Sequence, residues 1–195
     1  MHVVLETDRL LLRRFTEADA EALATLCGDP RVMRFISLEP PSLAEVQAEV
    51  QAEILPEYLR EYGELAEGLG SFAAMEKKTG QMAGRFSLKP ARSYGLTGGT
   101  ELGYRLSPPF WGRGLATEGA RALIRLAFEQ LHLDRVVATM MADNTGSWRV
   151  MEKCGLRRVG TFYYPDAQLM PGGERGDFVY ELTRGRWTGQ VKSES

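Results

Sequence analysis

Two glycines separated by one residue, Gly112 and Gly114, stand directly before an amphipathic stretch of the chain. Its predicted helix has the buried stripe Ala120, Leu123, Ile124, Ala127, Phe128 and Leu131. Small residues let the backbone approach a bulky anion, and the first turn of a helix presents free N–H groups with a partial positive charge. The segment therefore predicts a phosphate cradle, although a plain glycine-rich connection explains the loop alone equally well.

Two common phosphate-binding motifs do not fit this loop. A dinucleotide-binding fingerprint needs a third glycine at position 117, where the chain has Thr117, and no Gly-Lys-Ser or Gly-Lys-Thr triplet follows. The Gly-x-Ser-x-Gly elbow of serine hydrolases is also missing from the sequence. The loop thus suits a diphosphate without matching a common class of nucleotide-binding protein.

Apolar and alternating runs between glycines and prolines predict seven strands. They cover residues 10–14, 71–76, 82–88, 101–106, 135–141, 159–164 and 178–182. Helices are expected over residues 17–26, from Ser42 to the glycines at 68–70 with a kink or restart at Pro56, after the glycine loop, and from Asn144 to Cys154. This order predicts an α/β (α+β) fold in a single domain, residues 1–195, with about four helices on the faces of a sheet.

Composition excludes several classes of protein. The formal net charge of −2 provides no basic field for nucleic acid or an anionic membrane. Cys27 and Cys154 form no metal-binding pair and lie on apolar helical stripes, and there are two histidines, so we expect no metal site. No apolar stretch approaches the roughly 20 residues of a membrane span. The first twelve residues lack a secretory pattern, so a cytoplasmic protein is expected.

Three blocks of sequence carry a family resemblance. They are ELGYRL from Glu101 to Leu106, FWGRGLATEG from Phe110 to Gly119, and NTGSWRVMEKCGL from Asn144 to Leu156. In this order they resemble the GNAT superfamily of acyl-CoA-dependent N-acetyltransferases, and most of all its Rim-type branch, which acts on ribosomal-protein N-termini. The resemblance extends from about Leu5 to Trp187. It implies a GNAT-like, mixed and mostly antiparallel sheet of about seven strands, with strands four and five splayed at the cofactor site.

The resemblance implies acetyl-CoA as the cosubstrate. The superfamily loop, Gln/Arg-x-x-Gly-x-Gly/Ala, falls on residues 111–116, where Trp111 replaces the usual Gln or Arg. Backbone amides do most of the binding there, and a tryptophan does not remove them. Arg113 either contacts a phosphate or is a solvated loop residue. The expected cofactor-binding residues are Leu106, Trp111, Gly112, Arg113, Gly114, Leu115, Ala116, Thr117 and Asn144.

Enzymes of this kind transfer the acetyl group by direct attack of an amine on the thioester, and the protonated amine must lose a proton. Glu101 matches the strand glutamate that serves as general base, directly or through water; a surface glutamate at a strand end is the competing interpretation. Strand alternation places Glu101, Gly103 and Arg105 on one face. A backbone N–H in the gap between the splayed strands polarises the thioester carbonyl, and we expect it near Leu106.

Ser147 is expected to be the general acid that protonates the departing thiolate. It lies on the inner face of its helix, three residues after the Asn144 cap, where a hydroxyl must find a partner. The family resemblance makes that partner the CoA sulfur, whereas a bond to a carbonyl of its own helix is the competing interpretation. Asn144 is expected both to cap the helix and to contact the pantetheine of CoA.

An acidic segment borders the acceptor site of resembling enzymes. The segment from Glu39 to Glu67 contains eight glutamates and one basic residue. Five of the glutamates recur at every fourth position: Glu45, Glu49, Glu53, Glu57 and Glu61. Like charges at this spacing disfavour a helix by about 0.2–0.5 kcal/mol each. One hypothesis is that they attract a cationic acceptor, such as a basic peptide N-terminus, a polyamine or an aminoglycoside-like amine; a solvated acidic face is the simpler interpretation.

Two functions from different classes remain open at this level. The first is an N-acetyltransferase that acts on a primary amine of a peptide N-terminus or a small molecule. The second is a catalytically inactive GNAT-like module that binds CoA or a partner protein. The acceptor is not identified, and a monomer and a homodimer are both compatible with the sequence.

Overall fold

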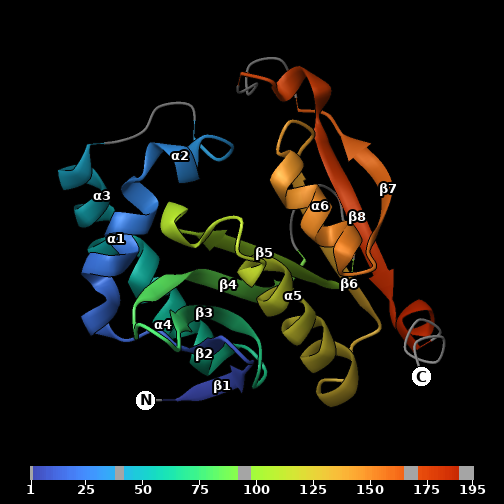
Figure 1. The fold of residues 1–195 in the computed structure, drawn as a ribbon, viewed down its shortest axis with the longest axis horizontal. Coiled ribbons are helices and arrows are strands. Elements are labelled where there is room, and N and C mark those ends of the chain that lie inside the picture. The colour runs from blue at the N-terminus through green and yellow to red at the C-terminus, as the bar shows by residue number, and fades with distance from the viewer. Residues whose placement is uncertain (1, 38–41, 92–97, 165–170, 189–195) are drawn as a thin grey trace.

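The computed structural model describes residues 2–37, 42–91, 98–164 and 171–188. Eight strands in these residues form one sheet, ordered β1-β2-β3-β4-β5-β6-β8-β7 (Figure 1). Their bounds are β1 Val3–Glu6, β2 Leu10–Arg14, β3 Gly70–Glu76, β4 Met82–Pro90, β5 Thr100–Leu106, β6 Arg135–Met141, β7 Arg157–Phe162 and β8 Asp177–Thr183. Neighbouring strands are antiparallel except β5 and β6, which are parallel. The mixed, mostly antiparallel sheet is confirmed.

The sheet has one strand more than the expected count of about seven, because β1 was not predicted. This strand has four residues at the edge of the sheet, and Val3 is 43% exposed. It pairs with β2 from Val3 opposite Arg13 to Glu6 opposite Leu11. A short edge strand has no buried face to impose alternation, so its partner rather than its own pattern makes it a strand.

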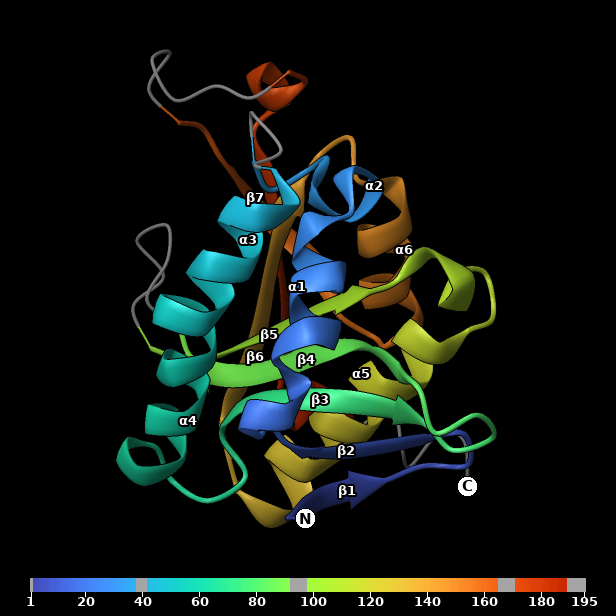
Figure 2. The ribbon, with the colours of Figure 1, turned by 90° about the vertical axis from the view of Figure 1, so that its left-hand side faces the viewer.

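Six α-helices with defined bounds cover the two faces of the sheet in the described part of the chain, two more than expected, and residues 184–188 are helical as well. Their bounds are α1 Ala20–Gly28, α2 Pro30–Met33, α3 Leu43–Glu49, α4 Leu55–Glu64, α5 Leu115–Arg125 and α6 Thr145–Lys153. Helices α1, α3 and α4 lie in front of the sheet in Figure 2, and α5 and α6 lie behind it. Two apolar cores result, one between the sheet and α1–α4 and the other between the sheet and α5 and α6.

Pro56 restarts the second helical segment, as expected. Proline has no N–H to donate, and the chain widens into a π-helical turn over Val50–Ile54 directly before α4. The expected end of this segment at the glycines 68–70 is wrong. Helix α4 ends at Glu64, because Leu65 turns to extended backbone while its N–H still donates to the carbonyl of Glu61.

Gly119 seats α5 against the sheet. A Cβ atom on this residue would lie 2.4 Å from Cζ of Phe86 on β4, so only a glycine permits the observed contact. The stripe predicted for this helix is confirmed, since its members are buried or pack against the core. The close contact holds α5 directly against β4.

The parallel strands β5 and β6 separate shortly after they meet. Their pairing consists of Thr100 opposite Val136 and Glu101 opposite Val137, yet β5 continues to Leu106 and β6 to Met141. The splay that the family resemblance implies is therefore confirmed. It opens a gap in the middle of the sheet.

Candidate active site

A cavity of about 460 Å³ lies at this gap. Its lining comes from β5, β6, the start of α6 and the residues after α2, and includes Glu101, Tyr104, Arg105, Thr139, Asn144 and Ser147. Glu101 and Tyr104 are three positions apart on β5 and so lie on opposite faces of the sheet. The cavity thus joins the two faces through the splay, and it brings the proposed base and the proposed acid of the sequence analysis into one space.

Glu101 is half-buried in the cavity wall. Its Oε1 accepts a hydrogen bond of 2.9 Å from the hydroxyl of Thr139 on β6. This contact spans the start of the splay and holds the carboxylate beside the gap. The alternation predicted for β5 is present, because Leu102 and Leu106 are buried in the core on the opposite face.

Asn144 and Ser147 form the expected start of α6. The side chain of Asn144 accepts a hydrogen bond of 3.1 Å from the N–H of Ser147, which makes it the cap of the helix. At the other end, Gly155 has φ +85° and the N–H of Leu156 donates to the carbonyl of Met151. Ser147 is half-buried and lines the cavity.

Tyr104 is a site residue that the sequence analysis missed. Its hydroxyl donates a hydrogen bond of 3.4 Å to Oγ of Ser147. Burial raises the pKa of Tyr104 to about 12, so its proton is retained at neutral pH. A tyrosine among the apolar residues on one face of a strand was the available signal, because a buried phenol needs a partner. Only the fold identifies Ser147 as that partner.

The glycine loop has the backbone geometry of a cradle. Gly112 and Gly114 have φ of +70° and +77°, and α5 begins at Leu115. The first intrahelical hydrogen bond is donated by Glu118 to the carbonyl of Gly114, which leaves the N–H groups of the first turn outside the helical ladder. Leu115 is buried in the core, so its side chain serves packing and only its backbone faces the loop.

Trp111 and Leu106, two expected cofactor-binding residues, are joined directly. The indole Nε1 of Trp111 donates a hydrogen bond of 2.6 Å to the carbonyl of Leu106. The N–H of the next residue, Ser107, donates to Ala83, so the N–H and C=O of Leu106 point away from β4 and towards the gap. This orientation is the one that a donor to a thioester carbonyl requires.

Arg113 is exposed, with 42% of its side chain accessible to solvent, but its guanidinium is already paired within the protein. Its guanidinium pairs with the carboxylate of Glu76, a buried residue at the end of β3, and it lies over the ring of Phe110. Residue type and spacing did not predict this pairing. The ion pair ties the glycine loop to the β3–β4 hairpin, whose Gly80 has the expected left-handed conformation.

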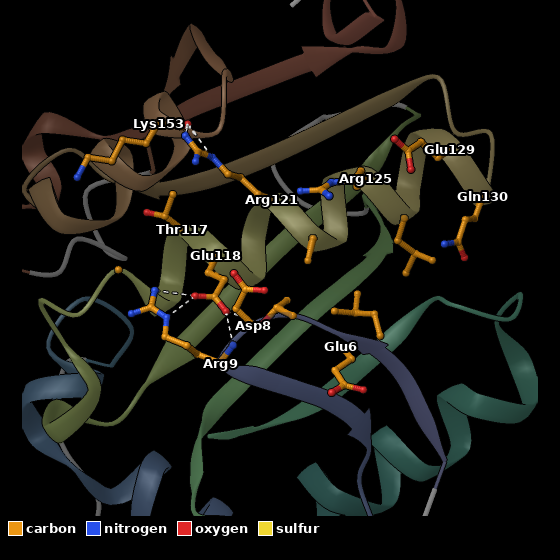
Figure 3. A pocket seen from close by; sticks show the side chains of 15 residues that line it. Glu6, Asp8, Arg9, Thr117, Glu118, Arg121, Arg125, Glu129, Gln130 and Lys153 are labelled. Carbon is orange, nitrogen blue, oxygen red and sulfur yellow. Dashed lines mark hydrogen bonds and ion pairs between the residues drawn. The ribbon is translucent and has the colours of Figure 1, made fainter. Parts of the chain in front are cut away.

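A second groove, of about 990 Å³, runs along the outer side of α5 (Figure 3). Gly114, Thr117 and Ala122 line it together with the β1–β2 turn. Arg9 on that turn donates to the carboxylate of Glu118 at 2.6 Å and to the carbonyl of Arg113 at 2.7 Å. Burial raises the pKa of Glu118, but hydrogen bonds from Thr7 and Arg9 outweigh it and the net pKa is lowered. The charged pair therefore braces the loop from outside.

The glutamates of the acidic segment differ in their burial. Glu45, Glu49, Glu53 and Glu57 are exposed on α3, the π-helical turn and α4. Glu61 is buried instead, where it pairs with Lys89 and accepts a hydrogen bond from the N–H of Ser71. Glu39 lies outside the described residues. None of the described glutamates of this segment lines the cavity at the splay.

Three further sequence predictions concern the cysteines, the possible metal ligands and the helix lengths of the described residues. Cys27 and Cys154 are buried, as predicted, and burial raises the pKa of both thiols. No three His, Cys, Asp or Glu side chains within residues 2–37, 42–91, 98–164 and 171–188 are grouped as a metal ion would need. Over the same residues, every helix is too short or too polar to cross a bilayer.

The fold class of the acyl-CoA N-acyltransferases is defined by a sheet that opens between two parallel strands. Beside the opening, a left-handed glycine turn leads into a helix. The chain belongs to the GNAT acetyltransferase family, since the model of the acetyltransferase (GNAT) domain matches residues 9–157.

Individual relatives cover different parts of the chain. It is 47% identical over 88 residues to FsC-acetyl coenzyme A-N(2)-transacetylase of Aspergillus fumigatus, a match to 45% of this chain and 37% of that protein. The uncharacterized N-acetyltransferase YoaA of Bacillus subtilis is 28% identical over 170 residues, which are 82% of this chain and 86% of the relative. The chain spans 37% and 50% of the lengths of two curated relatives that it matches strongly.

The fold is shared with solved structures. The spermidine N-acetyltransferase of Vibrio cholerae in complex with CoA and spermine has a TM-score of 0.72 to this chain, at 15% sequence identity. The alignment covers 93% of this chain and 99% of that one. At this identity the likeness concerns the fold alone.

Proposed function

We propose that the protein transfers an acetyl group from acetyl-CoA to a primary amine by direct attack. One observation carries the proposal: Glu101 and the Tyr104–Ser147 pair enter a single cavity from opposite faces of the sheet, at the splay of β5 and β6. An amine can approach a base from one face while a thiolate leaves towards an acid on the other.

The glycine loop and the first turn of α5 fit the diphosphate of CoA. Gly112 and Gly114 are exposed, and a Cβ atom on Gly112 would meet only open space. Leu115, Ala116 and Thr117 offer the N–H groups of the first helical turn to an anion. Asn144 lines the cavity at the start of α6, and we assign it the contact to the pantetheine.

Glu101 receives the proton of the amine, directly or through a water. The hydroxyl of Thr139 holds one carboxylate oxygen by its hydrogen bond, and Glu101 lines the cavity that the amine enters. The N–H of Leu106 points into the gap, where it stabilises the negative charge that develops on the carbonyl oxygen of the thioester.

Ser147 protonates the departing thiolate, and Tyr104 supports it. The tyrosine hydroxyl donates to Oγ of Ser147, so the serine proton is free to point at the sulfur. As Ser147 transfers its proton to the sulfur, Tyr104 transfers its own proton to Ser147. Tyr104 then regains a proton from solvent, and Glu101 releases to solvent the proton that it took from the amine. The raised pKa of Tyr104 means that its proton is present throughout the neutral range.

The acceptor is proposed to be the amine of a peptide N-terminus or of a small molecule. The three sequence blocks that resemble the Rim-type branch favour a peptide N-terminus. We propose further that residues 1–195 act as one domain, whether as a monomer or as a homodimer.

The test is release of free CoA thiol from acetyl-CoA with N-terminal peptides, polyamines, amino acids and antibiotics as acceptors. Thiol release that depends on an added amine supports the transferase. An inactive module gives a different result: acetyl-CoA raises the melting temperature of the protein, but no amine produces free thiol.

A further inference from the structure

Two arginines lie side by side in the wall of the cavity. Arg85 on β4 is directly opposite Arg105 on β5 in the strand register, so both side chains leave the same face of the sheet. Both are half-buried, and both line the cavity that holds Glu101. Glu101 and Arg105 share this face, four residues apart on one strand.

Neither guanidinium forms an ion pair with a carboxylate in the described part of the chain. Arg105 contacts Sδ of Met33 at 3.9 Å and lies beside the thiol of Cys27. The Nε of Arg85 is buried without a hydrogen-bond partner, and its guanidinium lies 5.7 Å from the centre of the Tyr58 ring. Sulfur atoms and an aromatic ring are weak partners for two full positive charges.

This arrangement is unfavourable in the protein alone. Like charges directly opposite on neighbouring strands repel, and a buried donor without an acceptor costs free energy. Burial lowers the pKa of Arg105 from its ordinary value, and the charge of Arg85 lowers it further. The two carboxylates of the cavity have other partners: Glu101 holds Thr139, and Asp177 accepts a hydrogen bond from Tyr164. The arginine pair is therefore suited to an anion that comes from outside the chain.

We infer that the acceptor is a primary amine that also carries an anionic oxygen group, a carboxylate or a phosphate, which Arg85 and Arg105 bind. The inference rests on the proposed transferase function, because Glu101 marks where the amine reacts. Four residues of strand separate Glu101 from Arg105, roughly 13 Å along the backbone, and a long arginine side chain shortens that distance. Two guanidiniums can together hold both oxygens of one carboxylate.

The anionic group distinguishes this inference from the acidic-segment hypothesis. The exposed glutamates of α3 and α4 favour cations at the outer surface, but the lining of the cavity presents arginines to the acceptor. A polyamine would add positive charge beside Arg85 and Arg105, which is electrostatically unfavourable. An amino carboxylate would instead neutralise them.

The experiment compares matched acceptors by kcat/KM. The pairs are 4-aminobutanoate and 6-aminohexanoate against their amides, with aminoethyl phosphate and spermidine as further arms. Charge-assisted hydrogen bonds predict a preference of about 10- to 100-fold for the carboxylates over the amides. The anionic group of the acceptor is the one, carboxylate or phosphate, whose amine gives the higher kcat/KM. Equal values for acid and amide, or spermidine as the best acceptor, overturn the inference.

Variants test the two arginines themselves. Arg105→Met and Arg85→Met should reduce the acid-to-amide preference to near one. They should also raise the melting temperature without ligand, because each removes one of two like charges. Arg60→Gln is the control, since Arg60 is exposed on α4, pairs with Glu64 and does not line the cavity; it should keep the preference. A preference that survives both Met variants overturns the assignment.

A titration without acetyl-CoA separates this inference from the proposed function. Binding of 6-aminohexanoate to the wild type, lost in Arg105→Met, supports the anion site even where no amine releases thiol, and the transferase proposal alone then fails. Turnover of amines without any preference, together with no binding in the titration, overturns the anion site and leaves the transferase intact.

Discussion

The hydroxyl of Tyr104 donates a hydrogen bond to Oγ of Ser147 and so joins β5 to α6 beside the splay. This contact predicts that both residues act on the departing thiolate. Ser147→Ala should lower kcat by about 10²- to 10⁴-fold, and Tyr104→Phe should lower it by less, because the serine hydroxyl remains. Steady-state kinetics should show little change in KM for acetyl-CoA. Full activity of Ser147→Ala would point to solvent or another acid.

Glu101→Gln should lower kcat by a similar factor, about 10²–10⁴, because the amide cannot take the proton of the amine. The pH–rate profile should lose its acidic limb, while the KM for acetyl-CoA stays close to that of the wild type. Glu21→Gln is the control, since Glu21 is exposed on α1 and does not line the cavity. An unchanged profile in Glu101→Gln would remove this residue as the base.

Gly114→Asp should abolish binding of CoA, through steric block and repulsion of the diphosphate. Gly114 has φ +77°, so any side chain also costs about 1–2 kcal/mol of backbone strain. Gly114→Ala carries that strain without the charge, and Gly80→Asp places the same charge on another left-handed glycine in open space. Calorimetric titration with CoA should show loss in Gly114→Asp alone. Retained binding there would contradict the cradle.

Gly119→Ala should destabilise the fold by about 1–3 kcal/mol, because the new methyl would overlap the ring of Phe86. Helix propensity alone predicts the opposite, a gain of about 1 kcal/mol. Gly63→Ala on α4 is the matched control, since no atom lies within 4 Å of its Cβ position, and it should be neutral or stabilising. Urea denaturation measures both. Recovery in Gly119→Ala/Phe86→Leu would locate the cause.

The stability of the fold should fall as the pH rises from 10 towards 12. In that window the unfolded chain releases the proton of Tyr104, whereas burial keeps it bound in the folded state, where the pKa is about 12. The folded state then binds more protons, so its stability decreases by about 1.4 kcal/mol for each pH unit and group. Tyr104→Phe should reduce this slope in urea titrations at pH 9, 10 and 11. An identical slope in the variant would be inconsistent with a buried, protonated phenol.

Local patterns were sufficient for most of the architecture. The stripe of α5, the Asn144 cap, the restart at Pro56 and the turn at Gly80 all depend on residues within a few positions of one another, and all are confirmed. The boundaries that failed depend on distant partners. Strand β1 needs β2 as its partner, and α4 ends where the backbone turns extended at Leu65.

The candidate site follows the same division. Residue type and spacing pointed to the glycine loop and to the Asn144 cap, and the family resemblance pointed to Glu101 and Ser147. The Tyr104–Ser147 contact, the pairing of Arg113 with Glu76 and the opposition of Arg85 and Arg105 join residues 20 to 43 positions apart. Such contacts arise from strand register and from the packing of helices on the sheet. Neither is expressed in a local pattern, so the partners of these side chains became visible only once the chain was folded.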